Sequence, residues 1–144
     1  MKNVIIETSE DWTGLILRLT AALIMLPHGL QKLLGVFGGF GYTKTMNYFT
    51  GTMKLPWIVS FLVIIIECVA PVGLIAGFIT RFWALLLLFV MMGAILTTAG
   101  RHGFFMNWNG GQQGEGYEYH LLFIAICLSI IIIGGGRYSV DARL

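Results

Sequence analysis

Residues 57–78 read WIVSFLVIIIECVAPVGLIAGF, a stretch in which Glu67 is the one charged residue. A helix needs about 20 predominantly apolar residues to cross the hydrocarbon of a bilayer, so this stretch is long enough to span it. A charged side chain at that depth costs about 2.5 kcal/mol or more unless it is paired, protonated or hydrated. The stretch therefore predicts a membrane helix, and Glu67 is the first candidate for a functional residue.

The composition extends the membrane assignment to the whole chain. Hydrophobic residues make up 57% of the 144 residues and charged residues only 11%, whereas soluble domains carry about 25% charged residues. The net charge is +2 without any run of Lys or Arg, so nothing indicates a nucleic-acid partner. Two cysteines are too few for a disulfide scaffold. A chain of this length has no room for a second domain, and we expect one transmembrane domain over residues 1–144.

The apolar stretches predict four transmembrane helices, at residues 12–34, 57–78, 82–99 and 117–134. Backbone groups in hydrocarbon must find their hydrogen bonds within the spanning segment, so the expected fold is all-α, a polytopic four-helix bundle. The short Thr80-Arg81 link makes the second and third helices antiparallel neighbours. Aromatic residues that favour the headgroup level lie near the helix starts: Trp12, Trp57, Trp83 and Tyr117.

Four helices place both chain ends on one side of the bundle, which we call the termini end, and the longer connections on the other, the loop end. The termini end has five Lys and Arg residues and the loop end has four. The positive-inside rule therefore favours cytoplasmic termini, by a margin of one basic residue. Residues 1–11, MKNVIIETSED, are too acidic for a signal peptide and are expected to be retained. Residues 35–56 and 100–116 are rich in Gly and aromatics, and we expect them to lie on the bundle or in the interface.

The depth of Glu67 suggests possible partners. It lies ten positions from Trp57, about 15 Å from the loop end, and His28 lies about 9 Å from the same end. Arg18 lies on the opposite half of the first helix. Three interpretations remain open: an Arg18–Glu67 ion pair that joins the first two helices, a proton-accepting Glu67 beside a small-molecule cavity, or a protonated, merely hydrogen-bonded Glu67.

The histidines gather toward the loop end. His28, His102 and His120 all fall there, and Tyr117 shares a helix face with His120 at i, i+3 spacing. Imidazole and carboxylate groups suit either a transition metal or the carbonyl of a quinone. Because no H-x-x-x-H spacing occurs, we expect no metal site, and we expect instead a polar cavity open to the loop end.

The chain resembles the DoxX family of small bacterial membrane proteins over nearly its whole length. The resemblance is carried by LRL at 17–19, HGLQKL at 28–33, Glu67, GFITR at 77–81 and GGGRYSVD at 134–141. The family usually has Pro where Gly135 stands. The resemblance implies four helices with cytoplasmic termini in the bacterial inner membrane. It also implies a link to redox chemistry, as in thiosulfate–quinone oxidoreductase subunits and oxidative or thiol stress complexes, but it assigns no catalytic residue.

Our first functional hypothesis is a redox-linked protein that binds a quinone or similar small molecule. Glu67 and His28 would be the catalytic residues, and the substrate would be bound by Arg18, His28, Glu67, Tyr117 and His120. The chain has no C-x-x-C, haem or flavin motif, so direct thiol–disulfide exchange is not expected.

The alternative is a non-catalytic anchor or assembly subunit for a redox or stress-response complex. A partner would then contact the termini end, at Arg81, Arg137, Tyr138 and Asp141. A small-solute transporter is a third possibility, disfavoured because Glu67 is the one strongly polar residue at mid-membrane depth. With so little polar surface, we expect a homo-oligomer or a partner subunit.

Overall fold

The computed structural model describes residues 5–8 and 11–144, and in this part of the chain every regular element is helical. The long helices are α1 (Trp12–Leu34), α3 (Trp57–Ala76), α4 (Thr80–Thr97) and α5 (Glu118–Ile133). Shorter elements connect or follow them: α2 (Gly41–Asn47), the π-helix η1 (Tyr48–Thr52) and the 3₁₀ turns η2 (Ala99–His102) and η3 (Asp141–Arg143). The predicted all-α membrane fold is confirmed, and the predicted helix bounds differ from the observed ones by no more than two residues.

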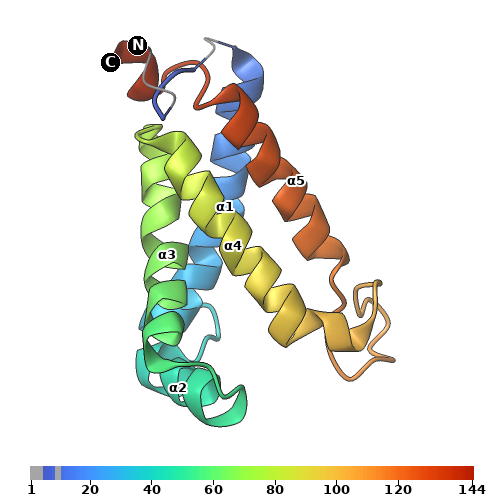
Figure 1. Cartoon of the computed structure of the whole chain (residues 1–144). Coiled ribbons are helices and arrows are strands. Elements are labelled where there is room, and N and C mark those ends of the chain that lie inside the picture. Colours follow the sequence, from blue (N-terminus) through green and yellow to red (C-terminus); the bar gives the residue numbers. More distant parts are fainter. Residues whose placement is uncertain (1–4, 9–10) are drawn as a thin grey trace.

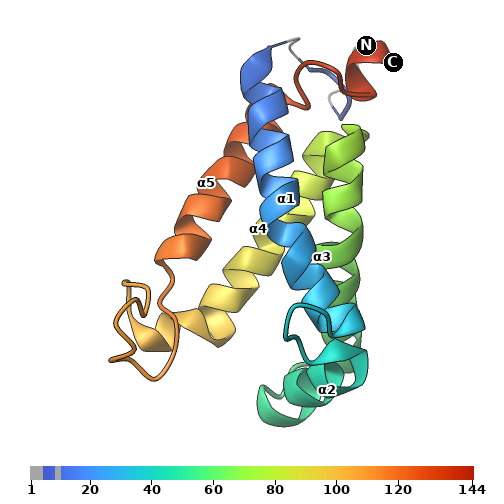
Figure 2. The ribbon, with the colours of Figure 1, turned by 180° about the vertical axis from the view of Figure 1, so that it is seen from behind.

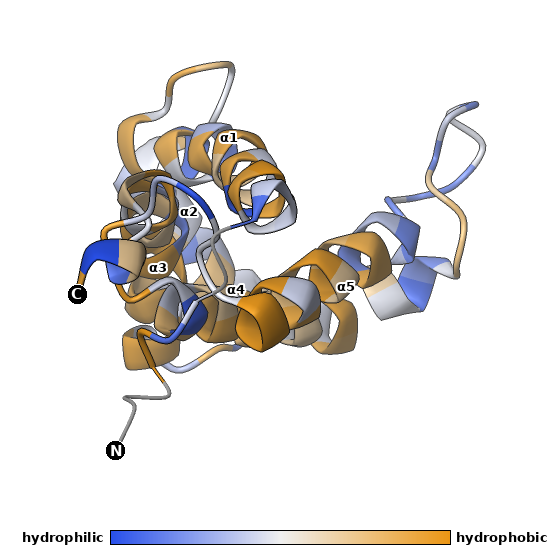
Figure 3. Ribbon diagram, turned by 90° about the horizontal axis from the view of Figure 1, so that it is seen from above, coloured by the Kyte–Doolittle hydropathy of each residue, from blue (hydrophilic) through white to orange (hydrophobic). Residues whose placement is uncertain are grey.

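Helices α1, α3 and α4 are long and apolar enough to cross a membrane. Helix α5 is equally apolar but has 16 residues, about 24 Å of helix, so it is shorter than the usual hydrocarbon thickness. Many large apolar side chains on these helices are exposed, among them Ile16, Leu23, Phe89, Leu122 and Ile132. Viewed from above, apolar residues cover the outer faces of the helices (Figure 3). Such a surface requires lipid as its solvent.

The helices form two pairs that meet at one end and diverge toward the other. Helix α1 packs along α3, and α4 packs along α5, while α3 and α4 are joined by a tight turn. Figures 1 and 2 show the two pairs close together near the C-terminus and spread apart toward α2 and the 98–117 connection. Alanines with no exposed surface allow close packing in the core, at positions 21, 22, 70 and 84.

Local sequence signals explain where the long helices begin and end. The Asp11 carboxylate accepts a hydrogen bond from Gly14 N at 2.7 Å and caps α1. Gly35 and Gly77 end α1 and α3 in the left-handed conformation, with φ of 75° and 67°. Pro56 precedes α3, where its missing N–H costs nothing.

The connection between α1 and α3 is more ordered than the sequence suggested. Residues 35–56 were expected to lie on the bundle, and they fold into α2 and η1 against α1 and α3. Residues 1–4 and 9–10 lie outside the described part of the chain, so the prediction that residues 1–11 are retained stays a prediction. The side of the membrane that each end faces also stays a prediction.

Candidate functional site

Glu67 lies where α3 crosses α1, and its surface is 3% exposed. Gly29 makes this crossing possible. A Cβ atom at Gly29 would lie 2.3 Å from the Glu67 carbonyl oxygen and 2.8 Å from Cys68 N, closer than atoms can approach. The two backbones therefore touch at the level of Glu67, as small residues permit in membrane helices.

The partner of the Glu67 carboxylate is Lys32, which sequence reasoning missed. Lys32 lies one turn after Gly29 on α1, and its Nζ donates a hydrogen bond to Glu67 Oε2 in a partly buried ion pair. Helical side chains lean toward the N-terminus of their own helix, so Lys32 reaches back into the bundle although its Cα lies near the end of α1.

The Arg18–Glu67 ion pair considered above is wrong, because Arg18 has other partners at the termini end. Its guanidinium donates to the carbonyls of Leu74 (2.8 Å), Ile75 (2.6 Å), Gly135 (2.8 Å) and Arg137 (3.2 Å). Helix α3 ends at Ala76, so its last carbonyls lack the usual partners four residues later, and Leu74 O accepts instead from the capping Gly77 N at 3.1 Å. Arg18 also donates to these last carbonyls and ties α3 to the segment after α5.

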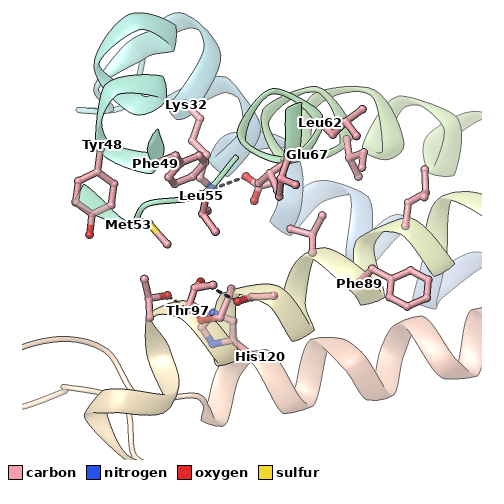
Figure 4. Close-up of a pocket in the computed structure, with 18 residues that line it drawn as sticks. Lys32, Tyr48, Phe49, Met53, Leu55, Leu62, Glu67, Phe89, Thr97 and His120 are labelled. Atoms are coloured by element: carbon pink, nitrogen blue, oxygen red, sulfur yellow. Dashed lines mark hydrogen bonds and ion pairs between the residues drawn. The ribbon is translucent and has the colours of Figure 1, made fainter. Parts of the chain in front are cut away.

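A cavity of about 520 Å³ opens between the diverging helix pairs next to Glu67. Its walls are mainly apolar, from α3, α4 and the segment that begins with η1. The residues that carry polar groups are Lys32, Tyr48, Glu67, Thr97, Thr98 and His120. Figure 4 shows Lys32 and Glu67 on one wall and Thr97 and His120 on the opposite wall. Leu62 and Phe89 lie toward one end of the cavity, and Tyr48 and Met53 lie toward the other.

His120 contributes an imidazole ring to the wall of the cavity. Its Nδ1 is buried and, like the neighbouring Tyr119 hydroxyl, has no hydrogen-bond partner among the described residues. Buried polar atoms are almost always hydrogen-bonded, and an exception needs an explanation such as a ligand or an ordered water. His120 also lies within electrostatic range of His28 and Lys32.

The structure brings together only some of the predicted site residues. Glu67 and His120 line the cavity. His28 is exposed on α1, where its ring lies 6.3 Å from the Tyr119 ring and within electrostatic range of Glu67, but it does not line the cavity. Tyr117 packs edge-on against Phe104 (5.6 Å between ring centroids), away from the cavity. Arg18 lies at the far end of the bundle.

Sequence reasoning also missed the cavity walls contributed by the first connection. Tyr48, Phe49, Met53 and Leu55 line the cavity from η1 and the residues after it. The one available signal was the aromatic content of residues 35–56, which indicated contact with the bundle without saying where.

The residues predicted to meet a partner lie together at the termini end, with different roles. Asp141 is buried, and its carboxylate accepts from Ile79 N (2.7 Å), Thr80 N (2.9 Å) and Thr80 Oγ1 (2.6 Å). It therefore acts within the chain as the cap of α4. Tyr138 is exposed, as is Arg137, and Arg81 donates to Ile132 O. Contact of these residues with a partner stays a prediction.

Three features define the site: a mainly apolar cavity, one carboxylate–ammonium pair in its wall, and a histidine ring in the opposite wall. No group of three or more His, Cys, Asp or Glu in residues 5–8 and 11–144 is arranged to hold a metal ion. These features describe a helical membrane protein with a mainly apolar cavity that carries a few polar groups in its walls.

Comparison with known proteins identifies the family. The DoxX family model matches residues 13–100, more than half of the chain, and the chain belongs to this family. It is 28% identical over 116 residues to the Bacillus subtilis protein named "Putative oxidoreductase CatD", covering 81% of this chain and 76% of that protein. It is 25% identical over 130 residues to the Escherichia coli protein named "Inner membrane protein YphA", covering 90% and 88%. No solved structure is significantly similar.

Proposed function

We propose that this DoxX protein is a redox-linked, multi-pass protein of the bacterial inner membrane that binds a quinone or similar ring-bearing small molecule in the cavity beside Glu67. The observation that carries the proposal is the placement of Lys32, Glu67 and His120 around one mainly apolar cavity of about 520 Å³. Ligand sites are commonly apolar cavities of about 300–1,000 Å³ with a few convergent polar groups.

The polar groups match the needs of a ring oxygen that gains or loses a proton. His120 lines the opposite wall, and its imidazole can form a hydrogen bond with a ligand oxygen. From the other wall, Lys32 donates a hydrogen bond to the Glu67 carboxylate in an ion pair. If Lys32 gives its proton to a reduced ligand oxygen, one negative charge remains on Glu67, and a proton taken up from water restores the pair.

The energetics of the ion pair also favour a functional role. Burying a carboxylate and an ammonium requires desolvation that their attraction roughly offsets, so apolar residues of similar size would often serve stability as well. Neither residue holds the helix crossing, which depends on the absence of a side chain at Gly29. The pair is therefore better explained by chemistry in the cavity than by packing.

The apolar walls would hold a hydrophobic tail or ring substituents. Leu62 and Phe89 lie on the side away from Tyr48 and Met53, and both side chains are exposed. A molecule dissolved in the bilayer could thus enter without crossing water. The name of the Bacillus relative supports an oxidoreductase association, and a partner subunit would supply or accept the electrons.

The test is titration of the purified protein with a short-tailed benzoquinone, followed by quenching of tryptophan fluorescence. Gly93 lines the cavity and has open space around it, so Gly93→Leu should fill the cavity without a backbone clash and weaken binding at least tenfold. Glu67→Gln removes the charge and should weaken binding by about ten- to a hundredfold, the scale of a hydrogen bond to a charged group. Glu115→Gln makes the same change in the exposed loop and should bind like the wild type. Wild-type affinity in both cavity variants, with folding intact, would refute the proposal.

A further inference from the structure

A second, smaller pocket lies at the termini end, far from the cavity beside Glu67. Its volume is about 230 Å³, and its lining consists of Arg137, Tyr138, Ser139, Ala142 and Arg143. It is formed by the hydrophilic turn that follows α5, which contrasts with the apolar helices in Figure 3. We propose that this pocket binds the phosphate of an anionic phospholipid headgroup.

The Arg137 guanidinium is held in a way that keeps its hydrogen-bond donors available. It lies over the Trp12 ring at 5.0 Å and the Tyr138 ring at 5.4 Å from the centroids. Contact with an aromatic ring uses the flat face of a guanidinium, while its N–H groups point outward in the plane and match phosphate geometry. Within residues 5–8 and 11–144, no carboxylate forms an ion pair with Arg137 or Arg143.

The backbone at the pocket is strained and firmly supported. Tyr138 has φ of 57°, a left-handed conformation that a bulky residue rarely adopts, and its side chain is exposed. The next residues fix this turn, because Val140 N and Asp141 N donate to Ala76 O and Gly77 O, and Ser139 Oγ donates to Gly136 O. Binding sites typically contain strained backbone that the surrounding structure stabilises, and here the strained residue is exposed and lines the pocket.

The position of the pocket favours a lipid over other carriers of phosphate. Trp12 begins α1, and Arg137 follows the end of α5 by four residues, so both lie where the helices leave the hydrocarbon. Trp and Tyr are enriched at this level, and basic pockets beside membrane helices bind anionic headgroups. Both aromatic side chains are more than half exposed, at 56% and 63%, and can flank the headgroup.

Native mass spectrometry of the full chain with added phosphatidylglycerol tests the proposal. The wild type should retain one phosphatidylglycerol more tightly than phosphatidylcholine, and excess inorganic phosphate should not displace it. Arg137→Gln with Arg143→Gln should weaken retention about 25-fold, since each basic residue near an anionic surface contributes roughly fivefold. Lys44→Gln with Arg101→Gln removes two exposed charges at the loop end and should change nothing.

Each outcome decides the question. The single variant Arg143→Gln alters an exposed side chain and should lower retention about fivefold even if the double variant folds poorly. Equal retention of both lipids by the wild type, or unchanged retention in the arginine variants, would overturn the proposal. Displacement by inorganic phosphate would also overturn it and assign the site to a soluble anion.

Discussion

Replacing Gly29 with alanine should force α1 away from α3 at the level of Glu67. The new Cβ would lie 2.3 Å from the Glu67 carbonyl oxygen, 2.6 Å from its carbon and 2.8 Å from Cys68 N. All three atoms belong to the backbone, so no side chain can turn aside, and the cost should approach the upper part of the range of about 1–3 kcal/mol for overpacking. Alanine recovers about 0.5–1 kcal/mol of helix propensity. The net loss of unfolding free energy should be about 1–2 kcal/mol.

Denaturant unfolding of the purified protein in micelles measures this loss, with Gly93→Ala as the matched control. Gly93 also lies inside a long helix, but a Cβ there meets no atom within 4 Å. Its alanine variant should keep or slightly raise stability, by up to about 1 kcal/mol. Equal stability of the two variants would show that α1 and α3 do not cross as closely at Gly29 as the structure has them.

Three further substitutions test the termini end. Arg18→Gln removes most of the four hydrogen bonds that the guanidinium donates to carbonyls, so it should destabilise the protein by about 3–5 kcal/mol. Size-exclusion chromatography should then show little folded protein. A normal yield with a normal melting temperature would contradict this prediction. Asp141→Asn removes the charge of the carboxylate that accepts hydrogen bonds from Ile79 N and Thr80, so it should lower the unfolding free energy by about 1–2 kcal/mol. Thr80→Val removes one of these three hydrogen bonds and should lower the unfolding free energy by less. Thermal unfolding ranks these two variants, and the reverse order would contradict the assigned cap.

The sequence predicted the helices well because the determinants are local. Apolar length, the glycines after α1 and α3, and Pro56 before α3 all act within a few residues. The same signals do not say how helices tilt. The divergence of the α4–α5 pair from the α1–α3 pair, which creates the cavity, depends on contacts between distant residues (Figure 1).

The site was predicted only in part, for a related reason. Depth along a helix can be counted, and it placed Glu67 and His120 toward the same end. Depth does not determine which face of the helix a residue occupies or which neighbours a long side chain contacts. Lys32 was counted only among the basic residues of the loop end and instead reaches Glu67, while Arg18 reaches the end of α3. Both are long, flexible cations whose head groups lie far from their Cα atoms.

The two ends of the molecule differ in how tightly they are closed. At the termini end, a Cβ at Gly14 would lie 2.6 Å from Gly136 Cα, and Arg18 and Asp141 satisfy the ends of α3 and α4. This end has no room to move without breaking several hydrogen bonds. At the loop end the helices separate, and the cavity beside Glu67 opens between them. Because one end is closed so firmly, the other can stay open without loss of the fold. Substitutions at the termini end should therefore affect accumulation of the protein, and those that line the cavity should affect binding.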